Sequence, residues 1–140
     1  MLTEDQVVDI TCLWLERQGW KIKSRCYGTA KGDDILATSI NDETLAVECK
    51  GAMSPNTMQS FHSNYLWKSI SGALFNTVRN VENKALVRME AIALPDTNEF
   101  RALTSTLQGF IERNHIFLFW VGPTGIVEVW QPYKLFKADV

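Results

Sequence analysis

The sequence predicts one α/β domain in which a mixed β-sheet is flanked by helices. Its 140 residues match the commonest size of a domain, so residues 1–140 are expected to fold as a single unit. Hydrophobic residues make up 46% of the chain and charged residues 21%, as is ordinary for a folded protein. Runs with helical spacing and runs of period two alternate along the chain, and they predict the order α-β-β-β-α-β-α-β-β.

The first helix and the first strand have clear sequence signals. Thr3 followed by Gln6 has the form of a capping box, and apolar residues then recur at helical spacing until Gly19. We therefore expect a helix over residues 4–18. Residues 20–26 alternate in polarity, which predicts a strand with one basic face made of Lys21, Lys23 and Arg25.

Two further β-type runs, residues 33–40 and 43–50, are separated by turn residues that favour a hairpin. If the chain turns about Asp42, Ile40 pairs with Thr44.

The rest of the chain predicts a helix over residues 57–79, a strand over residues 85–94, a helix from Asp96 to about residue 113, and a hairpin over residues 115–121 and 126–131. The second of these helices has Asp96 and Glu99 as its start signal.

Charged side chains converge at the predicted hairpin of residues 33–50. Side chains alternate between the two faces of a strand, so Glu48 and Lys50 share one face. The hairpin brings Asp34 near both, because cross-strand neighbours lie about 5 Å apart and diagonal ones about 7–8 Å. Asp33 is expected to point to the opposite face, so we prefer Asp34 as the member of this cluster.

Two nearby carboxylates form a hard oxygen site suited to Mg²⁺ or Mn²⁺. Such a metal lowers the pKa of a water that can attack a phosphodiester, and Lys50 beside it would orient or deprotonate that water. In the structural alternative, Asp34 begins a strand, and Glu48 and Lys50 are solvated neighbours. The apolar run before Glu48 favours the functional interpretation, because an unused carboxylate on a buried strand is costly.

Two segments, Gly32-Asp33-Asp34-Ile35-Leu36-Ala37 and Leu45-Ala46-Val47-Glu48-Cys49-Lys50-Gly51, resemble the motif of the PD-(D/E)xK nuclease superfamily, which includes restriction endonucleases and Holliday-junction resolvases. The order of elements resembles this family over nearly the whole chain. The resemblance implies a restriction-endonuclease-like sheet in which Asp34, Glu48 and the backbone carbonyl of Cys49 bind the metal. It also implies that Lys50 is the catalytic lysine.

The chain departs from the family pattern in two places. The proline-type position before the aspartate is Asp33, and the usual glutamate of the first helix is replaced by Val8. Glu4 lies one turn before Val8 on the apolar side of the helix, from which it could reach the metal through water. Its alternative role is a helix-start charge that complements the helix dipole.

Nucleic acid, with DNA preferred, is the expected substrate of a Mg²⁺-dependent nuclease. The net charge of −2 counts against binding through a basic field of the whole protein but leaves room for a local basic groove. The possible phosphate contacts are Lys21, Lys23, Lys31 and Lys68. Alternating basic residues also protect exposed strand edges, and Lys68 could simply be solvated.

Two rival functions stay open. A non-catalytic domain of the same fold would bind nucleic acid or an unidentified partner protein, and an unrelated interaction protein would carry the Glu-x-Lys triplet by coincidence. A homodimer is expected, because 140 residues leave little room for a recognition domain. The final hairpin could supply a hydrophobic dimer surface from Phe117, Phe119, Trp120 and Trp130.

The chain is expected in the cytoplasm, away from membranes. Its three cysteines are widely spaced without a CxxC pair, so we expect them to be reduced and not to bind zinc. The N-terminus has no basic segment before an apolar stretch, and no apolar run approaches the roughly 20 residues of a membrane span.

Overall fold

The computed structural model describes residues 1–28, 33–52 and 88–137. In these residues, six strands form one mixed sheet in the order β1-β2-β3-β4-β5-β6. The pairs β3–β4 and β4–β5 are parallel and the other neighbours are antiparallel. The strands are β1 (Lys21–Arg25), β2 (Ile35–Thr38), β3 (Thr44–Cys49), β4 (Met89–Pro95), β5 (Phe117–Gly122) and β6 (Gly125–Trp130). The predicted mixed α/β architecture is confirmed, whereas the helix expected over residues 57–79 lies outside the described residues.

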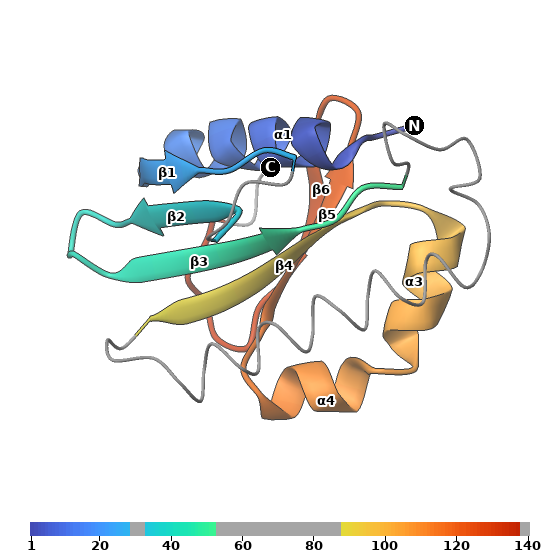
Figure 1. Ribbon diagram of the computed structural model, residues 1–140. Helices are drawn as coiled ribbons and strands as arrows, with labels where there is room; N and C mark the ends of the chain where they lie inside the picture. Colours follow the sequence, from blue (N-terminus) through green and yellow to red (C-terminus); the bar gives the residue numbers. More distant parts are fainter. Residues whose placement is uncertain (29–32, 53–87, 138–140) are drawn as a thin grey trace.

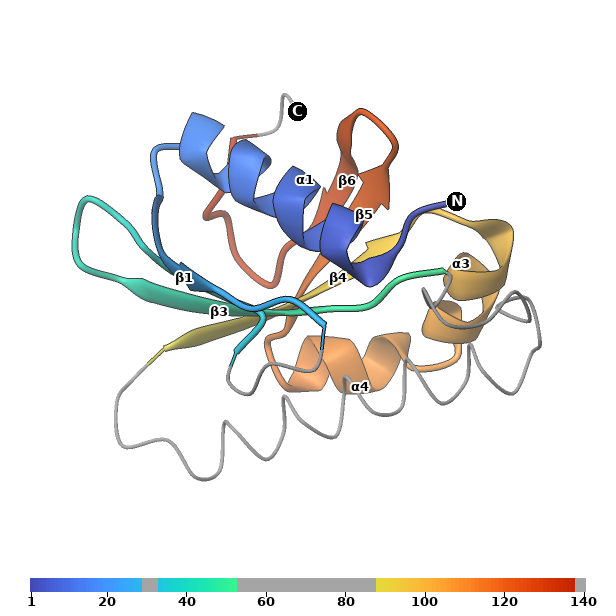
Figure 2. The same ribbon diagram turned by 45° about the horizontal axis from the view of Figure 1, so that its top comes forward.

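Helices cover both faces of the sheet (Figures 1 and 2). Helix α1 (Glu4–Arg17) packs on one face, and α3 (Asn98–Ser105) and α4 (Gln108–Arg113) pack on the other. Each face has its own apolar core. The core under α1 includes Val7, Leu15, Leu45, Val47, Ala91 and Phe119, and the core under α3 and α4 includes Ile92, Leu94, Phe100, Ile111, Leu118 and Trp120.

Helix α1 begins and ends close to the predicted positions. The side chain of Thr3 accepts a hydrogen bond from the N–H of Gln6, and the side chain of Gln6 accepts one from the N–H of Thr3. The predicted capping box is therefore confirmed. In the described part of the chain, no helix has both the length and the apolar character that crossing a membrane requires.

The predicted basic face of β1 is wrong, because a β-bulge interrupts the strand. Lys21 pairs with Thr38 and Arg25 pairs with Ile35, but the register shifts between Ile22 and Ser24. The extra residue reverses the faces that follow it. Lys21 and Arg25 therefore lie on opposite faces, and Arg25 turns toward α1, where it forms an ion pair with Asp9 at 3.5 Å.

The hairpin between β2 and β3 has a longer turn than predicted. Thr38, and not Ile40, pairs with Thr44, and the Ile40 side chain is 92% exposed. The Ser39 hydroxyl accepts a hydrogen bond from the N–H of Glu43 at 3.1 Å and so closes the turn early. A shift of two residues leaves every side chain on its predicted face.

The helix expected from Asp96 to residue 113 is divided into α3 and α4. The side chain of Thr97 caps α3 by accepting a hydrogen bond from the N–H of Phe100, whereas Asp96 forms an ion pair with Arg101 at 2.6 Å. The proposed start signal from Asp96 and Glu99 is therefore wrong. The division follows Thr106, whose hydroxyl donates to the carbonyl of Leu103 and competes with continued helical bonding.

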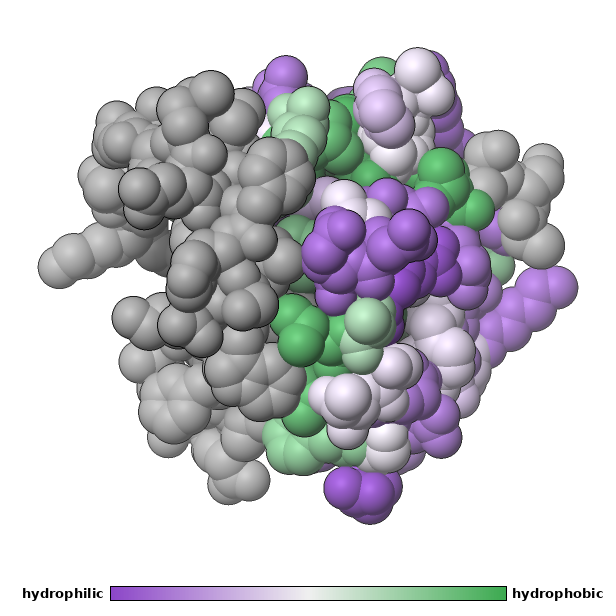
Figure 3. Space-filling view, turned by 90° about the vertical axis from the view of Figure 1, so that its right-hand side faces the viewer, coloured by the Kyte–Doolittle hydropathy of each residue, from purple (hydrophilic) through white to green (hydrophobic). Residues whose placement is uncertain are grey.

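The predicted hydrophobic dimer surface is also wrong. Phe117, Phe119 and Trp120 are at most 4% exposed within the chain itself, because β5 is covered on both faces. Trp130 is partly buried against the core under α3 and α4. The side of the molecule where α3 and the N-terminus lie has a hydrophilic area at its centre with smaller apolar patches around it (Figure 3).

Candidate functional site

Three parts of the chain meet where β3 ends: the first residues of the protein, the start of β2 and the residues after β3. The N–H of Ala52 donates to the carbonyl of Leu2 at 2.9 Å, which joins the chain after β3 to the segment before α1. A Cβ on Gly51 would lie 2.7 Å from the carbonyl carbon of Thr3 and closer still to the backbone nitrogen of Glu4. Glycine at position 51 thus permits the start of α1 to pack directly on the end of β3.

Asp34 is held between its two neighbouring strands. Its backbone carbonyl accepts the N–H of Cys26 at 2.9 Å, and its Oδ2 accepts the N–H of Cys49 at 2.8 Å. The β2–β3 register pairs Ile35 with Val47, so one further step places Asp34 opposite Glu48. The sequence prediction placed Lys50 there, and the longer turn of the hairpin explains the difference.

Glu48 lies half-buried on β3, on the face covered by α3 and α4. Burial, together with a hydrogen bond to Asp34 and the negative charge of Asp34, raises the pKa of Glu48 to about 8. Lys50 lowers this pKa by a smaller amount. Burial and the neighbouring carboxylate thus both favour the protonated form of Glu48 in the metal-free protein.

Glu4 and Lys50 belong to the same electrostatic cluster. Burial raises the pKa of Glu4, Lys50 lowers it by a smaller amount, and Asp34 raises it again. The structure thus brings together Asp34, Glu48 and Lys50, and the Glu4 considered in the sequence analysis lies close to them in the first turn of α1. The Cys49 thiol is fully buried under α1, so only the backbone of this residue faces Asp34.

The donor set suits a cation that takes few ligands from the protein. Across residues 1–28, 33–52 and 88–137, no three or more His, Cys, Asp or Glu side chains are grouped to hold a metal. Asp34 and Glu48 nevertheless place two carboxyl groups within hydrogen-bonding reach of each other, and Mg²⁺ commonly binds one or two carboxylates while it keeps several waters.

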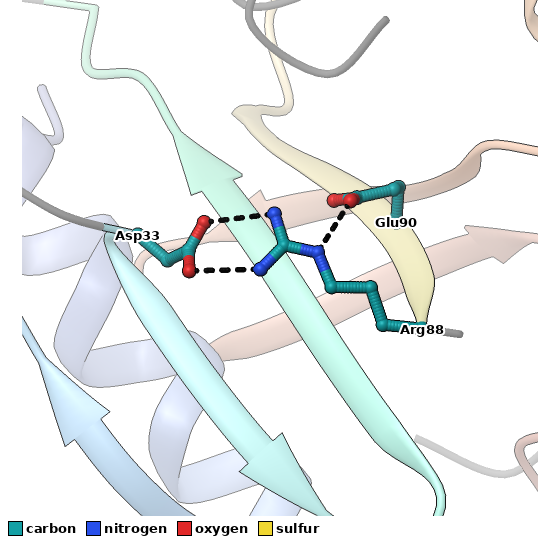
Figure 4. A network of polar contacts seen from close by, with 3 residues as sticks. All are labelled: Asp33, Arg88 and Glu90. Atoms are coloured by element: carbon teal, nitrogen blue, oxygen red, sulfur yellow. Dashed lines mark hydrogen bonds and ion pairs between the residues drawn. The ribbon is translucent and has the colours of Figure 1, made fainter. Parts of the chain in front are cut away.

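Arg88 is a site neighbour that sequence reasoning missed. It binds the Asp33 carboxylate through both terminal nitrogens, at 3.0 and 3.2 Å, and donates from Nε to Glu90 at 2.8 Å. Figure 4 shows the guanidinium over β3, between Asp33 and Glu90. Asp33 was predicted to point to the sheet face opposite to that of Asp34, and this is wrong for its carboxylate. Asp33 precedes β2, so the alternation of a strand does not apply to it, and its carboxylate binds the Arg88 guanidinium over β3. One sequence signal could have pointed to Arg88: Arg88 and Glu90 are charged residues at alternate positions beside the apolar run of β4.

The predicted phosphate contacts do not gather at this site in the described part of the chain. Lys21 and Lys23 line a surface pocket with Thr38 and Ser39, at the end of β2 opposite to Asp34. Lys21 pairs with Thr38, four residues from Asp34, which corresponds to roughly 13 Å along a strand. Lys31 and Lys68 lie outside the described residues.

Comparison with known proteins places the chain in no family. No family model matches the sequence, and neither a curated protein nor a solved structure matches it.

Proposed function

We propose that this chain is a Mg²⁺- or Mn²⁺-dependent nuclease with a restriction-endonuclease-like sheet, and that it hydrolyses phosphodiester bonds in DNA. The described order of elements is compatible with that sheet: an N-terminal helix, three antiparallel strands, two strands that continue in parallel, and a final antiparallel strand. The proposal for function rests on the site and on its resemblance to the PD-(D/E)xK motif.

The observation that carries the proposal is the Asp34–Glu48 pair. Two acidic side chains have been brought into hydrogen-bonding contact at a partly buried position, where the pKa of one is raised to about 8. This arrangement is unfavourable for a purely structural pair, because burial and like charge both oppose ionisation. Strongly perturbed carboxyl groups of this kind are characteristic of functional sites.

Each residue of the cluster has a chemical role in the proposed reaction. Asp34 and Glu48 would hold the cation, with the Cys49 carbonyl as a further donor. The bound cation supplies charge neutralisation at the phosphate and acidifies a water. Lys50, next to Glu48 on the same face of the sheet, would orient the attacking water and accept or stabilise its proton. Glu4 would orient a water at the edge of the site from the first turn of α1.

Calorimetric titration of Mn²⁺ and Mg²⁺ into the wild type and Asp34→Asn tests the proposal, with cleavage of plasmid, single-stranded and branched DNA assayed on the same samples. We expect binding and cleavage in the wild type and the loss of both in the variant. Asp96→Asn is the matched control, since Asp96 is an exposed aspartate whose partner, Arg101, is on α3. No binding to the wild type at millimolar metal would refute the proposal.

A non-catalytic domain that binds a partner is the second candidate, and one observation favours it. The described lysines of β1 lie away from the acidic cluster, and the net charge of the chain is −2. Metal binding without cleavage of any of the DNA substrates would favour this candidate.

A further inference from the structure

Asp33 and Asp34 lie outside the regular strand pairing that surrounds them. The β2–β3 pairing begins at Ile35, so no rung of this ladder fixes either aspartate directly. Asp34 has two backbone anchors, the N–H groups of Cys26 and Cys49. Neither anchor defines the path of the chain that enters Asp34 from Asp33.

The Arg88 guanidinium provides an anchor on that side. Its bidentate contact with Asp33 has a defined direction, because two parallel N–H donors meet two carboxylate oxygens. Side-chain exposure is 16% for Arg88 and 27% for Asp33, so solvent screens this pair less than it screens a surface pair.

Glu90 in turn fixes the orientation of the guanidinium. It is 6% exposed and accepts the Nε–H of Arg88 at 2.8 Å. Glu90 pairs with Ala46, and two residues later Ile92 pairs with Glu48, so Glu90 and Glu48 face the same side of the sheet. The network in Figure 4 therefore links Glu90, on the same sheet face as Glu48, through Arg88 to Asp33, the residue that precedes Asp34.

We propose that Arg88 is a positioning residue of the site: by holding Asp33 across β3, it sets the Asp34 carboxylate opposite Glu48. This role rests on the proposed function only in so far as the site binds a metal. A direct contact between Arg88 and a substrate phosphate is the weaker alternative, because three of the five guanidinium N–H groups, one on each nitrogen, already donate to carboxylates that orient the group away from a free approach.

Hydrogen exchange of single amides in the metal-free protein tests this role without any assay of activity. The Cys49 N–H donates to Asp34 Oδ2, whereas the next N–H, that of Lys50, donates to the Ala93 carbonyl on β4 at 3.1 Å. If Arg88 positions Asp34, Arg88→Gln should speed exchange at Cys49 about fivefold or more, the factor that one net hydrogen bond contributes. Exchange at Lys50 should stay unchanged.

Three further variants make the result specific. Asp33→Asn keeps the Arg88–Glu90 contact and should give the same selective effect, so it decides the matter if Arg88→Gln does not fold. Arg88→Lys keeps the charge but loses the two-pronged contact, and should restore protection only in part. Arg101→Gln is the matched control, because Arg101 also joins two carboxylates, on Asp96 and Glu128, away from Asp34.

Metal binding supplies the second readout. Where the wild type binds Mn²⁺, Arg88→Gln and Asp33→Asn should each weaken binding about tenfold, and the double variant should be no weaker than either. Unchanged protection of Cys49 in both single variants would overturn the positioning role, as would equally faster exchange at Cys49 and Lys50. A wild type that binds no Mn²⁺ would refute the proposed function, while the exchange at Cys49 would still decide whether Arg88 positions Asp34.

Discussion

Replacement of Glu48 by glutamine should stabilise the metal-free protein at pH 8 and leave its stability nearly unchanged at pH 4. The pKa of Glu48 rises from its ordinary value of 4.5 to about 8 in the folded protein, first through burial and then through its hydrogen bond to Asp34. Below pH 4.5 the carboxyl group is protonated in both the folded and the unfolded chain. Between pH 4.5 and 8 the unfolded chain loses this proton and the folded chain keeps it, so stability falls as pH rises.

The size of the effect follows from this window. Each pH unit between 4.5 and 8 lowers the free energy of unfolding of the wild type by at most about 1.4 kcal/mol. Partial exposure of Glu48 reduces the total loss to roughly 1–3 kcal/mol. Glutamine keeps the shape and can donate its amide N–H to Asp34, as the protonated acid does. At pH 8 the variant should therefore melt roughly 3–10 °C above the wild type.

The assay is thermal and urea unfolding at pH 4, 6 and 8 in the presence of a chelator. Glu16→Gln, a change at an exposed carboxylate of α1, is the control and should shift stability by no more than about 0.5 kcal/mol at any pH. A Glu48→Gln variant that is less stable than the wild type at pH 8, or a difference that does not vary with pH, would refute the argument. Added Mn²⁺ should reverse the order at pH 8, because only the wild type can release the proton and bind the metal.

Two further substitutions test how the site is built. Gly51→Ala should destabilise the fold by about 1–3 kcal/mol and weaken metal binding, because the new Cβ would meet the backbone of Thr3. Gly125→Ala, with no atom within 4 Å of its added Cβ, is the control in urea unfolding and calorimetry, and equal losses in the two variants would contradict the packing argument. Thr3→Ala should cost about 0.5–2 kcal/mol in urea unfolding through loss of the α1 cap, whereas Thr3→Ser should retain most of the stability.

Local sequence signals predicted the elements that depend on neighbouring residues. The capping box at Thr3 and the apolar β-type run that forms β3 could be recognised because each signal lies within a few residues of sequence, and both gave elements at the predicted place. The sheet class followed from the order of those elements.

Features that depend on distant partners were not predictable in the same way. The bulge after Ile22 is fixed by pairing with β2, and the early turn at Ser39 depends on a side-chain hydrogen bond that competes with further pairing. Because the turn shifted the register by two residues, the faces of Asp34 and Glu48 survived the error while their exact pairing did not. Arg88 was missed for a related reason, since 55 residues separate it from Asp33.

Two buried-strand carboxylates on one face of this sheet show what distinguishes a structural acid from a proposed functional one. Glu90 is nearly inaccessible, yet it accepts a hydrogen bond from a guanidinium, which stabilises the negative charge that burial would otherwise oppose. Glu48 is placed against Asp34, and the nearby Lys50 offsets only part of the combined effect of burial and like charge. The fold therefore bears an electrostatic penalty at Glu48 that Lys50 offsets only in part, and a bound cation would remove that penalty. This difference between two neighbouring carboxylates supports a metal site at Asp34 and Glu48 more strongly than the Glu-x-Lys triplet does, because the triplet alone cannot distinguish a compensated acid from an uncompensated one.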